Sequence, residues 1–329
     1  MSSAYERAAR RAVGWLTDRL ADDGSFREAD DDIACYYKAP YLFALAGHPA
    51  EANRLLSHVH RRFGRHDHDY RTTAETKSAN PAFEEFWAYP NGWITIAAQR
   101  MGRFDVAHPA FRFLRWFHQP ATGGFRTRGP QHAHNMGTDA LTTAHLGLAS
   151  LYFEDMERAE GAGRWLAETL RLQPDLDVGL YLRRDGAGAV VREFPDAEAA
   201  FHVVSATEPD QAYFMVGYPM AFLAALHRAT GHPGHLEAAW GYLDFALRCT
   251  GNLRSCHHSH KIAWGAAALA RTTGDQDCAT LATDIADHLL STQDDSGAWL
   301  PDQPALTRFD QTAEVAIWLL EITAALDGW

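Results

Sequence analysis

Acidic, basic and aromatic side chains gather where several apolar segments of this sequence begin. Residues 28–43, EADDDIACYYKAPYLF, place carboxylates directly before tyrosines and a lysine. Residues 255–264, SCHHSHKIAW, place His257, His260 and Lys261 on one face at helical spacing. Proteins move protons with carboxylates, imidazoles and amines, so these two segments predict acid–base chemistry on an organic substrate.

The candidate site residues lie near the starts of apolar segments, where helix N-termini would converge on one cavity mouth. The candidate catalytic residues are Asp32, Glu85, His257, His260 and Asp310. The candidate substrate-binding residues are Tyr36, Lys38, Trp87, Tyr89, Asn91, His134, Asp139, Asp210, Tyr213, Tyr218, Lys261 and Trp264. For each aspartate in these sets, capping of a helix is the alternative role. Residues 66–69, HDHD, are expected to form a solvated loop.

Cofactor motifs are absent from the sequence. It contains no Gly-rich phosphate loop, dinucleotide fingerprint, G-x-S-x-G elbow or H-E-x-x-H pair. Cys256 and the histidines that follow it are candidate zinc ligands, and zinc binding there is the alternative to lining a cavity. We expect no metal and no cofactor.

The elements that must position these residues are helices. Apolar residues recur at i, i+3, i+4 and i+7 in nearly every long segment, and few runs alternate as strands do. Charged amphipathic helices are expected at 4–21, 49–63, 105–118, 156–173, 233–249 and 276–291. Each has a partner rich in alanine, aromatic residues and glycine, at 32–47, 83–102, 138–153, 210–231, 255–274 and 309–328. The pairs repeat roughly every 55 residues, a length typical of two-helix units.

The partner segments are apolar nearly all round, which implies burial on both sides. We therefore predict an all-α fold, an (α/α)6 toroid of six inner and six outer helices, as a single domain over residues 1–329. A small β-hairpin is expected near 181–194, YLRRDGAGAVVREF. Pro90 is expected to kink the helix of residues 83–102.

Four turns share a signature of acidic or small polar residues and glycine, followed by an aromatic residue in three of them: ADDGSFRE (21–28), ATGGFRTRG (121–129), RRDGAGAVVRE (183–193) and DDSGAWLPD (294–302). With this pattern the sequence resembles the toroid superfamily of terpenoid cyclases and protein prenyltransferases, whose repeats carry a comparable turn. The resemblance implies the toroid architecture, on which glycan hydrolases, sugar epimerases and lanthionine cyclases also occur. The chain is also similar to toroid proteins that close aziridine rings in natural-product pathways, where an amine displaces a leaving group.

Composition limits the partners and the compartment. A net charge of -12 argues against binding to nucleic acid or to a membrane surface. The four cysteines are too few and too scattered for a secreted disulfide framework, and no run of 18 apolar residues occurs. We expect a cytoplasmic, bacterial protein that binds a small molecule. A carrier protein is a candidate partner, because Lys38 between aromatic residues suits an anionic or carrier-linked substrate.

These residues favour a cofactor-independent cyclase, lyase or isomerase of small-molecule, specialised metabolism, with a carboxylate and a histidine or lysine as acid and base. Three alternatives stay open: aziridine-type ring closure on an amino-acid-derived substrate, an intracellular glycan hydrolase or sugar epimerase, and a non-catalytic peptide-binding toroid. A carboxylate pair beside tryptophans would suit the glycan enzyme. A peptide-binding groove would contain no titratable groups with perturbed pKa values.

Overall fold

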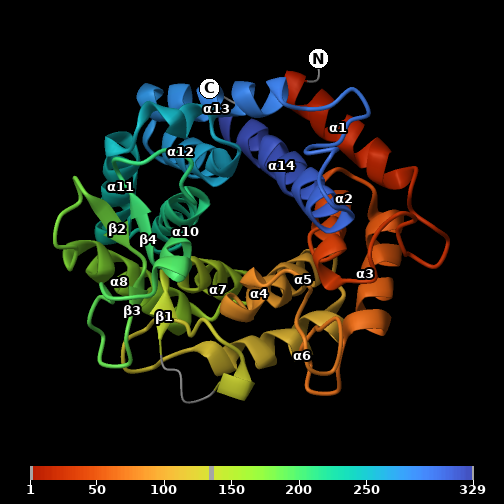
Figure 1. Cartoon of the computed structure of the whole chain (residues 1–329), viewed down its shortest axis with the longest axis horizontal. Helices are drawn as coiled ribbons and strands as arrows, with labels where there is room; N and C mark the ends of the chain where they lie inside the picture. Colours follow the sequence, from red (N-terminus) through yellow and green to blue (C-terminus); the bar gives the residue numbers. More distant parts are fainter. Residues whose placement is uncertain (1–2, 133–136, 328–329) are drawn as a thin grey trace. The chain divides into compact units, whose positions relative to one another are not determined.

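Paired helices make up most of the chain, as the sequence predicts. The computed structural model describes residues 3–132 and 137–327 (Figure 1). The charged helices are α1 (Ala4–Thr17), α3 (Pro49–Phe63), α6 (Phe104–Leu114), α8 (Met156–Arg171), α11 (Pro233–Arg248) and α13 (Gln276–Ser291). The low-charge partners are α2 (Ala39–Leu45), α5 (Tyr89–Arg100), α7 (Ala140–Tyr152), α10 (Phe214–Thr230), α12 (His260–Thr273) and α14 (Ala305–Leu326). Each predicted segment thus overlaps a helix, and α14 begins four residues before its predicted segment.

Short elements connect the pairs. The short helices are η1 (Ile33–Cys35), α4 (Ala82–Glu85), η2 (Arg115–Phe117), η3 (Pro130–His132), η4 (Asp196–Glu198), α9 (Ala199–His202), η5 (Gly251–Ser255) and η6 (His257–Ser259). Strand β1 (Thr138–Asp139) pairs antiparallel with β3 (Arg183–Arg184), and β2 (Gly179–Tyr181) pairs antiparallel with β4 (Val203–Ser205). The chain does turn back on itself in the predicted hairpin region, where Arg184 bridges Val190. Strands β2 and β3, however, pair with segments outside that region.

The packing divides the chain into two units. Unit 1 comprises Met1–Trp116 and Leu290–Thr323, and unit 2 comprises Phe117–Leu289 and Ala324–Trp329. In unit 1, α2 packs on α3 and on α5, and α5 packs on α6. In unit 2, α10 packs on α7, α11 and α12, while α8 packs on α7 and α11. Within each unit the low-charge helices are neighbours, and the charged helices lie along one side of them (Figure 1).

Burial follows the apolar pattern of the two helix classes. In α5, all residues from Tyr89 to Ala98 are buried, whereas α1 buries one face of alanines with Val13, Trp15 and Leu16. Pro90 occupies the first turn of α5, where a helix tolerates proline because the N–H it lacks has no helical partner. The predicted kink is therefore wrong: the chain breaks between α4 and α5, and Pro90 lies in the first turn of the new helix.

The glycines of three signature turns touch a neighbouring charged helix. Gly24, Gly123 and Gly297 have φ angles of 89°, 81° and 96°, in the left-handed region that favours glycine. A Cβ atom on these glycines would lie 2.5, 2.5 and 2.6 Å from the backbone oxygens of Arg54 in α3, Gly161 in α8 and Arg11 in α1. The sequence signature therefore marks close contact between a turn and a helix backbone.

The aromatic residues of the same turns are fixed by a shared hydrogen bond. The backbone N–H donates to a hydroxyl group of the next low-charge segment in each case: Phe26 to Tyr36 at 3.2 Å, Phe125 to Thr143 at 3.0 Å and Trp299 to Thr312 at 3.0 Å. Each turn thereby connects a charged helix to the segment that carries candidate site residues.

Gly24→Ala should cost much more stability than Gly47→Ala. Both glycines have positive φ, so alanine costs about 1 kcal/mol or more of strain at either position. Only Gly24 contacts backbone atoms, since a Cβ on Gly47 would meet nothing within 4 Å. We expect a total loss of at least about 3 kcal/mol for Gly24→Ala, measured by urea unfolding. Equal losses at the two positions would contradict the contact argument.

Candidate functional site

Lys38 forms a buried ion cluster with two acids of α14 in unit 1. Its Nζ atom lies 2.8 Å from Oδ1 of Asp310 and also pairs with Oε2 of Glu314. The exposed fractions of the Lys38 and Glu314 side chains are both 3%, while that of Asp310 is 13%. Asp310 and Glu314 are four residues apart and so share one face of α14. Burial lowers the pKa of Lys38, and the carboxylate of Asp310 opposes this shift.

Aromatic rings surround this ion cluster. The Nζ atom of Lys38 lies 4.9 Å from the ring centroid of Tyr37 and 6.0 Å from that of Tyr89. The ring centroids of Trp93 and Trp318 lie 5.6 Å apart, and Nε1 of Trp318 donates a hydrogen bond to Oε1 of Glu314. The ring faces carry negative charge density, so they stabilise positive charge beside them.

A second polar cluster lies between α7, α10 and α12 in unit 2. The Nζ atom of Lys261 lies 3.2 Å from Nε2 of His260 and over the rings of Phe214 and Tyr218, at 5.2 and 5.8 Å from their centroids. The hydroxyl of Tyr218 also forms a hydrogen bond with Nδ1 of His145. This arrangement brings together three sequence candidates, namely Tyr218, His260 and Lys261.

The tautomer of His260 follows from its partners. Its Nδ1 atom lies 2.8 Å from the carbonyl oxygen of His257, which can only accept, so Nδ1 carries the proton. Burial, with further contributions from Lys261 and His257, holds the pKa of His260 well below its usual range. The imidazole is therefore neutral at pH 7, and its Nε2 lone pair faces the amine of Lys261.

Asp139 caps α7 in unit 2 and is buried. Its Oδ1 accepts the backbone N–H of Thr142 at 2.8 Å, while Oδ2 is buried and makes no hydrogen bond to any residue that the structure describes. Burial raises the pKa of Asp139 to about 6, and Arg183 opposes this shift. Asp139 therefore caps α7 and also has a pKa close to neutral pH.

Asp32 makes the contacts of a cap and a tether. Its Oδ1 accepts from the backbone N–H of Ala34 at 2.8 Å and from the hydroxyl of Ser78 at 2.6 Å. Its Oδ2 accepts from the backbone N–H of Ala79 at 2.7 Å. Both oxygens are thus engaged in joining the start of η1 to the loop that precedes α4.

Asp32→Asn is expected to lower the free energy of unfolding by about 2 kcal/mol. Asparagine can keep the contacts of Oδ1, but its Nδ2 would then face the N–H of Ala79, which leaves two donors opposed at a half-buried contact. Thermal unfolding of the variant beside Asp31→Asn, an exposed residue that pairs with Arg62, would measure the difference. A silent Asp32→Asn would show that the tether adds nothing to stability.

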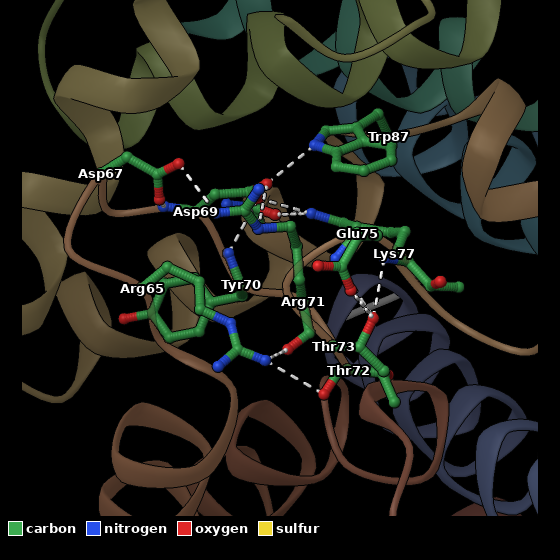
Figure 2. Close-up of polar contacts among 12 residues, drawn as sticks. Arg65, Asp67, Asp69, Tyr70, Arg71, Thr72, Thr73, Glu75, Lys77 and Trp87 are labelled. Atoms are coloured by element: carbon green, nitrogen blue, oxygen red, sulfur yellow. Dashed lines mark hydrogen bonds and ion pairs between the residues drawn. The ribbon is translucent and has the colours of Figure 1, made fainter. Parts of the chain in front are cut away.

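Trp87 and Asn91 belong to a buried network around Asp69 and Lys77 in unit 1. Figure 2 shows Lys77, Trp87 and Arg71 converging on the carboxylate of Asp69. Nζ of Lys77 lies 2.7 Å from Oδ1 of Asp69 and also donates to Oδ1 of Asn91. Nε1 of Trp87 donates to Oδ2 of Asp69 at 2.9 Å. The expectation of a solvated loop at residues 66–69 is therefore wrong for Asp69, which is 1% exposed.

The remaining candidates lie apart from the two clusters or at their edges. Tyr36 stacks on Phe26, 5.3 Å between ring centroids, and Glu85 is buried at the end of α4. Asp210 is exposed and exchanges hydrogen bonds with Asn252. Three others complete the set: the hydroxyl of Tyr213 lies 3.4 Å from Oγ1 of Thr250, Trp264 packs edge-on against Tyr218, and His134 lies outside the described residues.

Sequence reasoning does not select His145, Asp69 or Lys77. It places Glu314 beside Asp310 among the polar residues near the helix starts, one helical turn further on, but gives it no catalytic role. His145 sits in an apolar helix whose sequence gives no sign of the facing Tyr218. The charge of Lys38 is compensated by two acids, so the argument from Lys38 for an anionic or carrier-linked substrate loses its support.

The described residues contain neither a candidate metal site nor a helix that could span a membrane. No three or more His, Cys, Asp or Glu side chains among them gather as a group that could hold a metal ion. No helix among them has the length and hydropathy needed to cross a membrane.

Solved structures similar to this chain come from several classes of enzyme. A D-mannose isomerase aligns with a TM-score of 0.73 and 10% identity, over 98% of this chain and 97% of that chain. The GH76A α-1,6-mannanase from Salegentibacter sp. HEL1_6 aligns with a TM-score of 0.65 and 15% identity, over 98% and 100%. The type II terpene cyclase MstE from Scytonema aligns with a TM-score of 0.60 and 15% identity, over 98% and 99%.

No protein-family model matches the sequence, and no curated protein is similar to it. The structural similarities span nearly the whole chain at low identity, so they show the fold and not the reaction. The chain has the six-hairpin (α/α)6 toroid fold that D-mannose isomerase, GH76 mannanases and type II terpene cyclases share.

Proposed function

We propose that this protein is a cofactor-independent cyclase or lyase of small-molecule metabolism whose substrate passes through a cationic intermediate beside Asp310. The observation that carries the proposal is the sharing of one buried ammonium group, Lys38, by the carboxylates of Asp310 and Glu314. When all three groups are ionised, the cluster has a net charge of -1 in a buried place. Such a charge favours positive charge developing in a neighbouring substrate.

The aromatic residues support the same chemistry. The faces of Tyr37 and Tyr89 already contact the ammonium of Lys38, and Trp93 and Trp318 extend this wall. Aromatic faces attract cations without reacting with them, which suits a carbocation or an iminium-like species. A ring closure or elimination would then end when a C–H bond breaks, its electrons form the new double bond and Asp310 takes the proton.

Each member of the cluster has a distinct role in this proposal. Asp310 is the most exposed of the three charged groups, so it is the one that meets the substrate. Lys38 orients Asp310 through the 2.8 Å contact, and Glu314 compensates the ammonium charge from the buried side. The carrier-protein partner remains a candidate that Lys38 no longer supports.

The proposal is tested by incubating the protein with a bacterial metabolite extract in D₂O and comparing it with heat-inactivated protein by untargeted mass spectrometry. A cyclase converts a metabolite into a product of equal mass but different retention, and a lyase gives a product lighter by a neutral fragment. Proton return from the medium would place deuterium in the remaining substrate or the product. An extract unchanged by folded protein would count against the proposal.

A glycan enzyme is the second candidate, because Asp310 and Glu314 beside Trp93 and Trp318 also fit an oxocarbenium-like transition state. Release of reducing sugar from a panel of α- and β-linked oligosaccharides would favour this candidate. The peptide-binding alternative has less support, since buried groups with perturbed pKa values, such as Lys38 and His260, are present in both units.

A further inference from the structure

The lysines of this chain are unusual in number and in position. The sequence contains three lysines and 27 arginines, and Lys38, Lys77 and Lys261 are 3%, 0% and 2% exposed. Lysine is almost never fully buried unless it is paired, and its compact ammonium changes protonation state more readily than a guanidinium. What each buried amine can do therefore depends on the groups that it contacts.

The three buried amines differ in the groups they contact. Lys38 pairs with two carboxylates, and Lys77 pairs with the carboxylate of Asp69 at 2.7 Å. The Nζ atom of Lys261 lies 3.2 Å from Nε2 of the neutral imidazole of His260. A carboxylate holds an ammonium group in its charged form, whereas a neutral imidazole can accept a proton from it.

We propose that Lys261 is a nucleophilic amine that forms a Schiff base with an aldehyde or ketone. Three groups form a continuous line: Nζ of Lys261, then the imidazole of His260, then the carbonyl oxygen of His257, with contacts of 3.2 and 2.8 Å. This is the arrangement of an activated nucleophile, in which a base lies within hydrogen-bond reach and a third group orients the base. The proposal goes beyond the function proposed for unit 1 and stands on unit 2 alone.

The reaction balances without any further reagent. The ammonium of Lys261 gives a proton to Nε2 of His260, and the amine lone pair forms a bond to the carbonyl carbon. The attached nitrogen, now positively charged, passes one of its protons to the former carbonyl oxygen, which gives a neutral carbinolamine. The C–O bond then breaks, the oxygen leaves as water with the proton that His260 returns, and the nitrogen lone pair forms the C=N bond. Nothing is oxidised or reduced, and one water is released for each iminium formed.

The start of α12 is held in place by a close contact with α10. A Cβ atom on Gly217 would lie 2.2 Å from the backbone carbon of Lys261, so the glycine allows the two helix backbones to touch at this residue. His260 is also fixed, because its ring stacks on Phe214 with 6.2 Å between ring centroids and an interplanar angle of 14°. The amine and its base thus belong to packed helices and not to a loop.

The rings around Lys261 indicate the class of carbonyl compound. Phe214 and Tyr218 lie 5.2 and 5.8 Å from Nζ, and Trp264 packs edge-on against Tyr218 with 5.3 Å between centroids. Phe214 and Trp264 are half-buried, so the more accessible side of the cluster is aromatic. This lining suits a carbonyl compound that carries an aromatic or other apolar group.

The test is reductive trapping on the native protein. Benzaldehyde is added, the imine is reduced with sodium borohydride, and peptide mapping by mass spectrometry locates the secondary amine. We expect stable alkylation at Lys261 and none at Lys38 or Lys77, with faster labelling by benzaldehyde than by pyruvate. Because the chain has three lysines, the assignment needs no lysine variant.

Matched reactions make each outcome informative. Protein unfolded in urea should label at all three lysines, which verifies the reagents. His260→Gln, with folding checked by circular dichroism, should slow labelling of Lys261 by about 100-fold, the lower range of general base catalysis. The proposal is overturned if native protein labels Lys38 or Lys77 as fast as Lys261, or if Lys261 stays unlabelled while the unfolded chain reacts. Unchanged labelling of His260→Gln would overturn the role of the imidazole, and pyruvate reacting faster would overturn the apolar substrate class.

Discussion

Lys77→Met should lower the free energy of unfolding by about 3 to 4 kcal/mol, the lower part of the range for a buried ion pair that loses one partner. Lys77 and Asp69 are 0% and 1% exposed, so the carboxylate that remains cannot be hydrated without opening the structure, although Nε of Arg71 stays 3.4 Å from its Oδ2 and reduces the loss. The substitution also removes the donor to Oδ1 of Asn91. Methionine has a similar length, so little cavity forms. Urea unfolding followed by tryptophan fluorescence would measure the loss.

Two further variants separate the buried charge from the lost packing. Arg62→Met breaks an exposed pair with Asp31, and we expect a change of at most about 1 kcal/mol. The double variant Lys77→Met with Asp69→Asn removes both charges and should regain part of the loss. If Lys77→Met proves as mild as Arg62→Met, the network of Figure 2 does not hold the loop to α5.

The helix pairs could be predicted because burial follows the period of the apolar residues. Every residue of α5 from Tyr89 to Ala98 is buried, and its sequence has almost no charge. The turns that contain glycine and an aromatic residue could also be recognised in the sequence, but the reason why they need glycine could not. The contact of Gly24 with the backbone of Arg54 joins residues that are distant in the sequence, and composition does not reveal such a contact.

The candidate site could be predicted less well than the fold, because the role of a polar residue depends on the groups that it contacts. Asp32 and Asp310 both precede or begin apolar segments, and the sequence gives them equal standing. In the structure Asp32 accepts three hydrogen bonds from local groups, whereas Asp310 pairs with Lys38. The buried position of Asp69 was hidden by its polar neighbours in the HDHD run, since one inward side chain in a polar loop leaves no periodic signal.

The roles of the histidines in unit 2 likewise depend on contacts that the sequence does not reveal. The spacing of His257, His260 and Lys261 predicts a shared location, and in the structure they adjoin where η6 meets α12: His260 contacts the carbonyl oxygen of His257 and the amine of Lys261. The protonation of His260 could not be predicted, since it depends on burial and on which atom meets the carbonyl oxygen of His257. The partner of Tyr218, His145, comes from a different helix pair.

Asp310→Asn is expected to reduce turnover of the metabolite identified by the extract comparison by at least about 100-fold, or about 3 kcal/mol of activation free energy. Asparagine keeps the size of the side chain but can neither accept the proton nor supply the negative charge beside the cation. Stability should change little, because the amide oxygen still accepts from Lys38 and Glu314 then compensates the ammonium charge one to one. The side-chain amide of Gln311, which donates to Oδ2 of Asp310 at 2.6 Å, can turn over so that its oxygen accepts from the new Nδ2. Steady-state kinetics and thermal unfolding of the same preparation would measure both quantities.

Glu321→Gln is the matched control, since Glu321 lies on the same helix, α14, and accepts a hydrogen bond from the hydroxyl of Tyr41 at 2.7 Å. We expect its turnover to stay within about two-fold of the unmodified protein, because it does not contact Lys38. Full activity of Asp310→Asn would remove Asp310 from the proton transfer. In that case Glu314→Gln would distinguish two possibilities. Lost turnover with retained folding would show that Glu314 accepts the proton, and retained turnover would show that the Lys38 cluster is structural.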